Sequence, residues 1–205
     1  MRCYTKKVFF GDFIFDVLPD VYEPAEDSFL IAENLVVNAG ESVLDMGTGC
    51  GILGIVAAKK ASMVLAVDIN PHAIRCARKN AKSNKVEDKM FFLLGDLFSP
   101  IKVNVKFNLI TFNAPYLPSE PCESETWVGR AWAGGINGRE VIDRFVCDAA
   151  KYLGKNGRIL LLQSTLADVR RTLNLLQASG LEADTLLKLD LPFFETLVLI
   201  EAKKP

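Results

Sequence analysis

The pattern with the clearest chemical meaning is an acidic residue followed by alternating glycines. Asp45 precedes Gly47, Gly49 and Gly51, with a short apolar run before it and a helix-forming stretch after it. Glycines in such a turn let the backbone bend tightly and approach a ligand, and the next helix adds partial positive charge. In open α/β sheets, nucleotides bind at this point, where the first strand ends.

Two ligands compete for this turn. Gly49-x-Gly51-x-x-Gly54 formally matches the dinucleotide fingerprint, with Asp68 available for a ribose, so an NAD-type site is one interpretation. However, Asp45 would repel a pyrophosphate and suits a ligand with a cationic amino-acid end, such as S-adenosylmethionine. The two oxygens of Asp68 would then accept hydrogen bonds from both ribose hydroxyls.

A third acid, Asp96, ends the next predicted strand and is followed by Leu97 and Phe98. A carboxylate there could accept from an adenine amine while the two apolar side chains pack nearby. Alone, Asp96 would be interpreted as a turn residue. Because three consecutive strand ends carry an acid, the binding-site interpretation is favoured.

The segment Asn113-Ala114-Pro115-Tyr116 follows a further apolar strand. Pro115 biases Ala114 toward an extended backbone. The Asn113 side-chain carbonyl and the Ala114 backbone carbonyl could then point the same way and hold both hydrogens of a planar NH2 group. Tyr116 offers an aromatic face for a flat amide or base. The segment therefore favours methyl transfer to a planar nitrogen.

Strands and helices alternate along most of the chain, which predicts a doubly wound, mostly parallel sheet. An N-terminal hairpin at 8–17 and a helix from Pro24 to about Asn38 come first. Further strands are expected at 42–46, 64–67, 90–94, 107–112, 158–162, 186–191 and 196–201, and helices at 52–60, 71–83, 139–153 and 166–178. We expect one domain over 1–205, with an extension at 1–40 and a Rossmann-like core at 41–205, and a functional loop at 113–138.

Composition excludes several classes of protein. With 24 Lys+Arg, 25 Asp+Glu and 50% hydrophobic residues, the chain is neither disordered nor basic enough to hold nucleic acid mainly by phosphate neutralisation. Its five cysteines are scattered and include no C-x-x-C, so neither a disulfide framework nor a zinc or other metal site is expected. No signal peptide or membrane-spanning run is visible, and we expect a cytoplasmic protein. The single histidine, His72, is interpreted as structural.

Two further motifs, Val21–Ser28 and Trp132–Glu140, together with the acid–glycine turn and Asn113–Tyr116, resemble the HemK family, in particular its short archaeal and eukaryotic branch. The resemblance covers the chain from about Val21 onward. It implies a class I methyltransferase with a seven-stranded sheet whose last strand is antiparallel. It also implies S-adenosylmethionine as cofactor and, as substrate, the glutamine amide in the Gly-Gly-Gln loop of a class I release factor.

The resemblance implies roles for individual residues. Cofactor contacts are expected from Ser28, Asp45, Gly47, Asp68, Asp96, Leu97 and Asn113, and Thr48, Gly49, Gly51 and Ile69 complete the expected cofactor set. Asn113, Ala114, Pro115 and Tyr116 form the expected catalytic set. The family pattern has proline where this chain has Ala114, so a backbone N–H is restored and φ is freed at that position.

Two alternative functions stay open. The same four-residue segment serves amino methyltransferases of adenine or guanine in nucleic acid, and a non-catalytic nucleotide-binding module is also conceivable. Three acids in the long loop (Glu120, Glu123, Glu125) favour a basic protein substrate. A basic stripe on the helix over 71–83 is interpreted as a solvated face (Arg75, Arg78, Lys79, Lys82).

The resemblance also implies a partner. Enzymes of this branch often need a small zinc-binding activator subunit that extends their sheet. The apolar strand over 90–94 would be the sheet edge in this topology, and an apolar edge strand is a liability unless it is covered.

Overall fold

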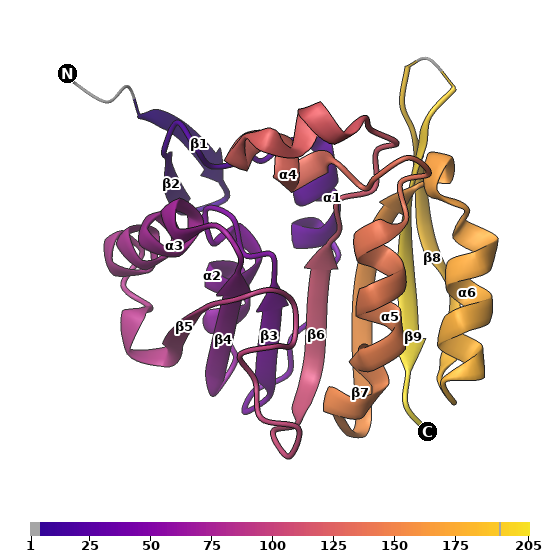
Figure 1. The fold of residues 1–205 in the computed structure, drawn as a ribbon. Helices are drawn as coiled ribbons and strands as arrows, with labels where there is room; N and C mark the ends of the chain where they lie inside the picture. The colour runs from indigo at the N-terminus through magenta and orange to yellow at the C-terminus, as the bar shows by residue number, and fades with distance from the viewer. Residues whose placement is uncertain (1–4, 193) are drawn as a thin grey trace. The chain divides into compact units, whose positions relative to one another are not determined.

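Figure 1 shows the chain as a computed structural model, in which residues 5–192 and 194–205 are described. The chain divides into two compact units, with the boundary after Pro100. The main sheet contains seven strands in the order β5-β4-β3-β6-β7-β9-β8, and a separate hairpin is formed by β1 and β2. The last strand, β9, runs antiparallel to both its neighbours. The expected class I methyltransferase fold is therefore confirmed.

The first unit carries the hairpin and three strands of the main sheet. Its strands are β1 (Lys6–Phe10), β2 (Phe13–Val17), β3 (Ser42–Met46), β4 (Met63–Asp68) and β5 (Met90–Leu94). Its helices are α1 (Glu26–Glu33), α2 (Ile52–Ala58), α3 (Pro71–Ser83) and a 3-10 turn at Glu87–Lys89. β3, β4 and β5 pair in parallel. Four of the five residues in β3 are buried, as expected for a strand covered on both faces.

The second unit carries the other four strands. They are β6 (Phe107–Asn113), β7 (Leu153–Ser164), β8 (Glu182–Asp190) and β9 (Thr196–Lys203). Its helices are α4 (Trp127–Trp132), α5 (Glu140–Tyr152) and α6 (Val169–Ala178), with 3-10 turns at Pro121–Glu125 and Thr165–Ala167. Phe112 of β6 packs on Phe145 of α5, with ring centroids 4.7 Å apart. This contact fixes the strand end from which Asn113 emerges.

Several predicted boundaries were wrong. The first helix ends at Glu33 rather than near Asn38, because the Asn34 side chain bonds back to the Leu30 carbonyl and two β-branched valines follow. The predicted loop over 113–138 contains α4, whose cap is the Thr126 side chain. The predicted strand at 158–162 extends over Leu153–Ser164, and that at 186–191 over Glu182–Asp190.

The N-terminal hairpin is held to the first unit by two asparagines of α3. The Asn80 amide accepts from the Asp16 backbone N–H and donates to the Asp16 carbonyl, at 2.9 Å each. One turn later, Asn84 makes the same pair of bonds to Ile14. The two amides therefore act as a neighbouring strand would, satisfying alternate backbone groups of β2.

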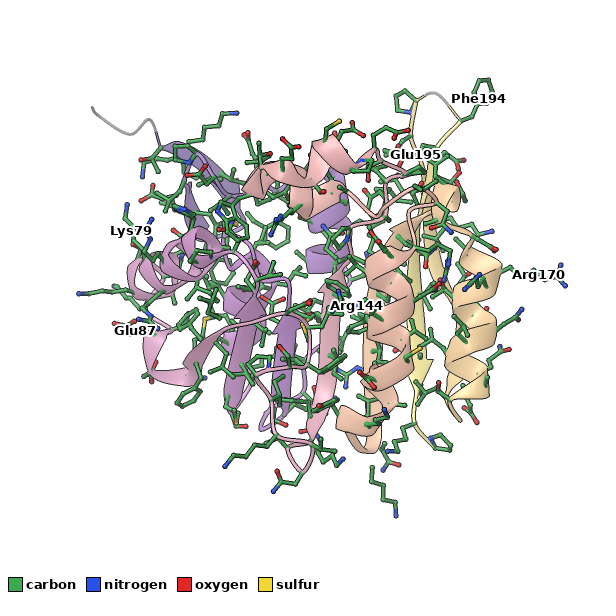
Figure 2. The ribbon with its side chains drawn as sticks, in the orientation of Figure 1. Lys79, Glu87, Arg144, Arg170, Phe194 and Glu195 are labelled. Atoms are coloured by element: carbon green, nitrogen blue, oxygen red, sulfur yellow. The ribbon has the colours of Figure 1, made fainter. Side chains whose placement is uncertain are left out.

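Asn80 has a second task, because its amide also donates to the Cys50 carbonyl at 2.8 Å. Cys50 lies in the glycine turn, so one buried side chain connects the hairpin, α3 and that turn. The adjacent residue Lys79, labelled in Figure 2, makes a solvent-exposed contact, an ion pair with Asp16 at 2.8 Å. Among the described residues, no helix is long and apolar enough to span a membrane.

We predict that Asn80→Leu lowers the free energy of unfolding by about 2–4 kcal/mol. The bonds to the Asp16 N–H and carbonyl and to the Cys50 carbonyl are lost, which leaves partly buried groups of β2 and a buried carbonyl of the glycine turn without their partner. Urea unfolding measures the change. Asn84→Ala is the control and should cost only about 1 kcal/mol, because its site is partly exposed to water. Equal losses for the two variants would contradict the special role given to Asn80.

Candidate functional site

The glycine turn joins β3 to α2 in the first unit. Gly47, Gly49 and Gly51 all have positive φ, from +56° to +92°, which residues with side chains rarely adopt. Gly51 is closely packed, because a Cβ there would meet Ala77 and Ile55 at 3.1 Å. At Gly49 a Cβ would meet only the Gly47 carbonyl oxygen, 4.0 Å away. The turn is thus tight against α3 at one glycine and open at another.

The Asp45 side chain holds this turn through hydrogen bonds. It is fully buried, and its Oδ2 atom accepts from the Thr48 hydroxyl at 2.6 Å and from the Gly54 N–H at 3.0 Å. Gly54 must be glycine for this contact, since a Cβ would lie 2.9 Å from the same oxygen. One face of the Asp45 carboxylate is therefore used to fold the turn and anchor the start of α2.

Asp68 at the end of β4 stands beside the turn. Its Oδ2 accepts from the Gly49 N–H and its Oδ1 from the Asn70 N–H, both at 2.8 Å. Burial raises the pKa of Asp68 above the ordinary value of 3.8, and the backbone N–H groups of Asn70 and Gly49 oppose that shift. The Ile69 backbone N–H also bonds to this carboxylate, so three N–H groups are accepted where about four can be, and room for a further donor remains. The adjacent Ile69 is 44% exposed, an apolar surface next to this carboxylate.

The segment after β5 completes the row of acids. The Gly95 N–H bonds to the Asp68 carbonyl at 2.9 Å, which brings the ends of β4 and β5 together. Leu97, next to Asp96, has φ of +48°, a left-handed conformation unusual for leucine. A non-glycine residue in this conformation persists only where the surrounding structure holds it in place. The expected cofactor residues of the first unit thus include a connected group (Asp45, Thr48, Gly49 and Asp68) with Asp96 and Leu97 on the neighbouring strand end.

Ser28 sits in the N-terminal segment and is buried. Its hydroxyl donates to Asp27 Oδ1 at 3.1 Å, and the other oxygen of Asp27 accepts from the Tyr22 hydroxyl at 3.0 Å. These three residues come from one predicted motif, and the structure brings them together as a small buried cluster.

The other expected site residues lie in the second unit, at the end of β6. Asn113 pairs in register with Leu162 of β7, and its side-chain oxygen is buried. The Ala114 N–H donates to the Leu162 carbonyl at 3.3 Å. A proline at this position would have no N–H to give. The restored N–H is therefore used, and it ties the residue after Asn113 to the neighbouring strand.

The chain after Tyr116 is braced by the segment that leads into α5. Leu117 forms a parallel bridge with Ala133, through bonds from the Leu117 N–H to Trp132 and from the Gly134 N–H to Leu117 at 3.0 and 2.8 Å. Gly138, with φ of +71°, lies directly against the Tyr116 carbonyl, where any side chain would clash. The second motif, 132–140, thus supports the backbone of the expected catalytic segment.

The acidic side chains of the loop between Leu117 and Ala133 face solvent. Glu120, Glu123 and Glu125 are all exposed. Glu123 also caps the 3-10 turn by accepting from the Glu120 N–H at 2.7 Å. Arg130 lies over the Trp127 ring, 5.0 Å from its centroid, and bonds to the Ser124 carbonyl. The net character of the loop surface is acidic, as the sequence predicted.

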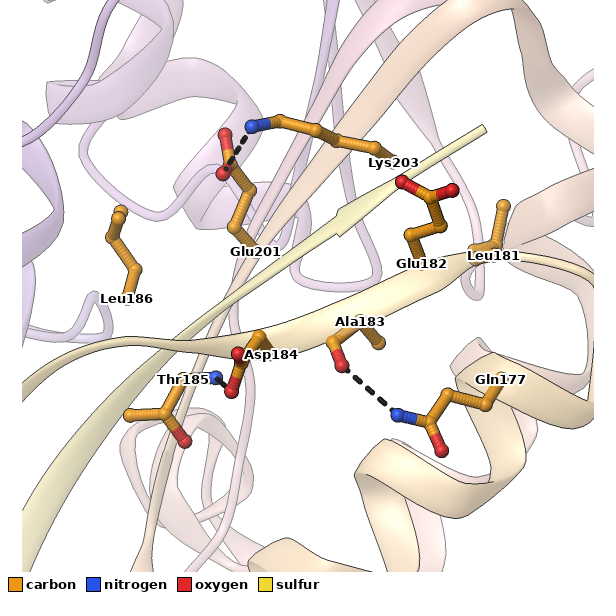
Figure 3. Close-up of a pocket in the computed structure, with 9 residues that line it drawn as sticks. All are labelled: Gln177, Leu181, Glu182, Ala183, Asp184, Thr185, Leu186, Glu201 and Lys203. Atoms are coloured by element: carbon orange, nitrogen blue, oxygen red, sulfur yellow. Dashed lines mark hydrogen bonds and ion pairs between the residues drawn. The ribbon is translucent and has the colours of Figure 1, made fainter. Parts of the chain in front are cut away.

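Sequence reasoning did not assign a role to Gln163, a buried amide near the end of β7. It donates to the Ala167 carbonyl at 3.0 Å and accepts from the Thr172 hydroxyl at 2.6 Å. The available signal was a polar residue that ends a run of four apolar ones, Ile159–Leu162. A hollow beside β8, drawn in Figure 3, contains none of the expected site residues; it is lined by α6, β8 and β9 residues such as Gln177, Leu186 and Lys203.

The chain is similar to known methyltransferases. A family model for ribosomal protein L11 methyltransferase (PrmA) matches residues 28–114. A Methanocaldococcus jannaschii protein, provisionally named a protein N5-glutamine methyltransferase, is 42% identical over 88% of this chain and 91% of its own. Human methyltransferase HEMK2 is 35% identical over 82% of this chain and 83% of its own.

Solved structures agree with the fold. The E. cuniculi Mtq2–Trm112 complex, responsible for methylation of the eRF1 translation termination factor, matches with a TM-score of 0.69 and 26% identity, covering 91% of this chain and 99% of that chain. The M. jannaschii tRNA m1G37 methyltransferase has a TM-score of 0.72 at 23% identity, covering 100% of this chain and 55% of that chain. The second likeness shows the fold alone.

We predict that the four cysteines among the described residues will divide into two classes when the native protein is treated with iodoacetamide. Cys50 and Cys76 are buried, and burial raises the pKa of both thiols, so little thiolate is available to react. Cys122 and Cys147 are exposed and should be alkylated at least roughly tenfold faster. Peptide mass spectrometry after timed quenching reads each site separately. Labelling of Cys50 in the native protein as fast as after unfolding would contradict the closed packing around the glycine turn.

Proposed function

The chain belongs to the HemK family of methyltransferases, and from that membership we propose that it methylates the side-chain amide nitrogen of the glutamine in the Gly-Gly-Gln loop of a class I release factor. The observation that carries the proposal is 42% identity over nearly the whole chain to a relative named for N5-glutamine methylation. The Asn113–Tyr116 segment would supply the acceptors that such an amide requires.

We propose S-adenosylmethionine as the methyl donor, and the donor set of the first unit fits it. The ribose hydroxyls need a strong acceptor, and the Asp68 carboxylate, which keeps room for a further donor beside an open glycine, would supply it. Ile69, Asp96 and Leu97 would hold the base, while Asp45 and Gly47 would lie next to the amino-acid end. When bound, this cofactor supplies a methyl group that its sulfonium makes electrophilic.

The second unit would hold the nucleophile. An amide nitrogen is a weak nucleophile because its lone pair is delocalised into the carbonyl. The Asn113 side-chain oxygen and the Ala114 backbone carbonyl would accept its two N–H bonds, fix its orientation and stabilise the positive charge that develops on nitrogen. Tyr116 would contact the flat face of the amide.

Ala114 is compatible with this role. The group used at that position is a carbonyl, which alanine has as proline does. The hydrogen bond from the Ala114 N–H to Leu162 restrains the backbone that proline would restrain covalently. We therefore expect an active enzyme rather than a cofactor-binding module without catalysis.

The acidic loop favours a protein substrate over nucleic acid. Its exposed glutamates would repel phosphates and attract a basic protein surface. The basic stripe on α3 is partly neutralised: Lys79 pairs with Asp16, Arg75 contacts His72, and Arg78 lies over the Phe92 ring. These contacts are those of a solvated helix face rather than a phosphate-binding surface.

We also propose that β5 receives a small activator subunit, which the resemblance describes as zinc-binding. β5 ends the strand order of the sheet, as expected. Phe91 is 53% and Leu94 55% exposed on this edge strand, a combination that invites pairing with another chain. The likeness to Mtq2, solved in complex with Trm112, supports a partner of this kind.

We predict that cofactor affinity depends on the ionised form of Asp68. Affinity should be full at neutral pH and fall as the pH drops through the Asp68 pKa, which burial raises above 3.8. Asp68→Asn should weaken S-adenosylhomocysteine binding at least roughly tenfold at pH 7, the worth of one charge-assisted bond of about 1.5–3 kcal/mol. Calorimetric titration across a pH series measures both effects. Identical affinity and pH profiles for the two proteins would contradict the ribose role.

We predict that Asn113→Ala lowers the rate of methyl transfer to a purified release factor by at least roughly a hundredfold, because one of the two amide acceptors is gone. S-adenosylhomocysteine binding should change far less, since most of the expected cofactor residues lie in the first unit. Transfer is followed with labelled S-adenosylmethionine, with and without a candidate activator subunit. Asn108→Ala, on the same strand, is the control. A fully active Asn113→Ala variant would rule out the assignment.

A further inference from the structure

We propose that Arg139 is a positioning residue for the Asn113–Tyr116 segment, and this inference rests on the proposed function. Arg139 is only 3% exposed and precedes α5. Burying a guanidinium costs desolvation free energy unless its N–H groups are hydrogen-bonded, so a buried arginine indicates a specific structural role. The contacts that it makes lead by two routes to the backbone that presents Ala114 and Tyr116.

The guanidinium is held on three sides. Its Nε and Nη2 atoms both donate to Asp143 Oδ1, at 3.1 and 2.6 Å. Its Nη1 atom donates to the carbonyls of Ala167 and Asp168 and, at 3.1 Å, to the Thr172 hydroxyl. Arg139 therefore fastens the segment before α5 to the turn between β7 and α6. Only the planar fork of arginine offers enough donors in these directions.

The first route runs through the end of β7. Thr172 donates its hydroxyl to Gln163, whose amide donates in turn to the Ala167 carbonyl that Arg139 also contacts. Gln163 is adjacent to Leu162, and the Leu162 carbonyl accepts the Ala114 N–H. Leu162, which accepts the Ala114 N–H, is thus next in sequence to Gln163, which belongs to the hydrogen-bond network of Arg139.

The second route runs through Gly138, the residue before Arg139. Gly138 lies against the Tyr116 carbonyl, and a Cβ there would also approach the Ala167 side chain to 3.2 Å. The position of Gly138 is therefore fixed between Tyr116 and the turn that Arg139 clamps. Loss of the guanidinium contacts would therefore weaken both the packing of Gly138 against Tyr116 and the hydrogen bond from Ala114 to Leu162.

Arg171 provides a matched comparison. It donates to the other oxygen of the same carboxylate, Asp143 Oδ2, at 2.9 Å. Its side chain is 54% exposed, whereas that of Arg139 is 3% exposed. An exposed ion pair of this kind contributes little stability. Removing Arg171 deprives Asp143 of one cation without touching the Ala167 turn or Gly138.

The test uses full-length Arg139→Lys, Arg139→Met and Arg171→Met proteins. Methyl transfer to the release factor gives kcat and KM, calorimetry gives S-adenosylhomocysteine affinity, and thermal melting shows that each variant is folded at the assay temperature. We expect kcat to fall by about ten- to a hundredfold in Arg139→Met, the effect of misplacing acceptors by a fraction of an ångström to 1 Å. KM and cofactor affinity should change by less than about threefold.

Arg139→Lys decides the matter if Arg139→Met does not fold. Lysine keeps the charge but lacks the fork, so kcat should still fall at least roughly fivefold at unchanged cofactor affinity. Arg171→Met should keep the wild-type kcat. A folded Arg139→Lys with wild-type kcat would overturn the inference, as would an equal kcat loss in Arg171→Met. All assays include the candidate activator subunit, and a wild-type enzyme that is still inactive with it, at normal cofactor affinity, would instead overturn the proposed function itself.

Discussion

A backbone carbonyl can be aimed at a ligand only by fixing the chain on both sides of it, because it has no side-chain torsion of its own. This constraint governs the segment after β6. The Ala114 N–H is tied to Leu162 on the neighbouring strand, Gly138 stands against the Tyr116 carbonyl, and the Leu117–Ala133 bridge holds the exit. Much of the second unit can be understood as support for these few atoms.

In the first unit, two aspartates have different structural roles. Asp45 and Asp68 lie near the ends of the consecutive strands β3 and β4. Asp45 is used to fold the glycine turn, whereas Asp68 accepts from the backbone N–H groups of Gly49 and Asn70. Asp68 differs because its oxygens are not exhausted and its environment raises its pKa. Asn80 then connects the turn to the N-terminal hairpin, which makes the extension part of the same rigid arrangement.

The sequence predicted what local chemistry decides. The helix at Pro71–Ser83 has both predicted ends because Asn70 caps it and Pro71 suits its first turn. The strands β3 and β5 also have their predicted ends. α4 was missed because Trp127–Trp132 is a single short helix with no apolar period long enough to detect.

Long-range polar contacts could not be predicted. Arg139 was visible as part of a motif, and its ion pair with Asp143 has the i,i+4 spacing of a helix. Its other partners, Ala167, Asp168 and Thr172, are distant in sequence, and nothing in the spacing shows that they converge on it. The brace of Gly138 on Tyr116 joins positions more than twenty residues apart. Such contacts depend on tertiary packing, so local propensity carries no signal for them.

The most direct test of the account is to map the methyl group on the substrate. A purified release factor is incubated with this protein, its candidate activator and labelled S-adenosylmethionine, and the modified residue is located by fragmentation mass spectrometry. The account predicts one methyl group on the glutamine of the Gly-Gly-Gln loop and no label when that glutamine is replaced by alanine. Label that persists in the alanine variant, or that appears only on nucleic acid, would contradict it.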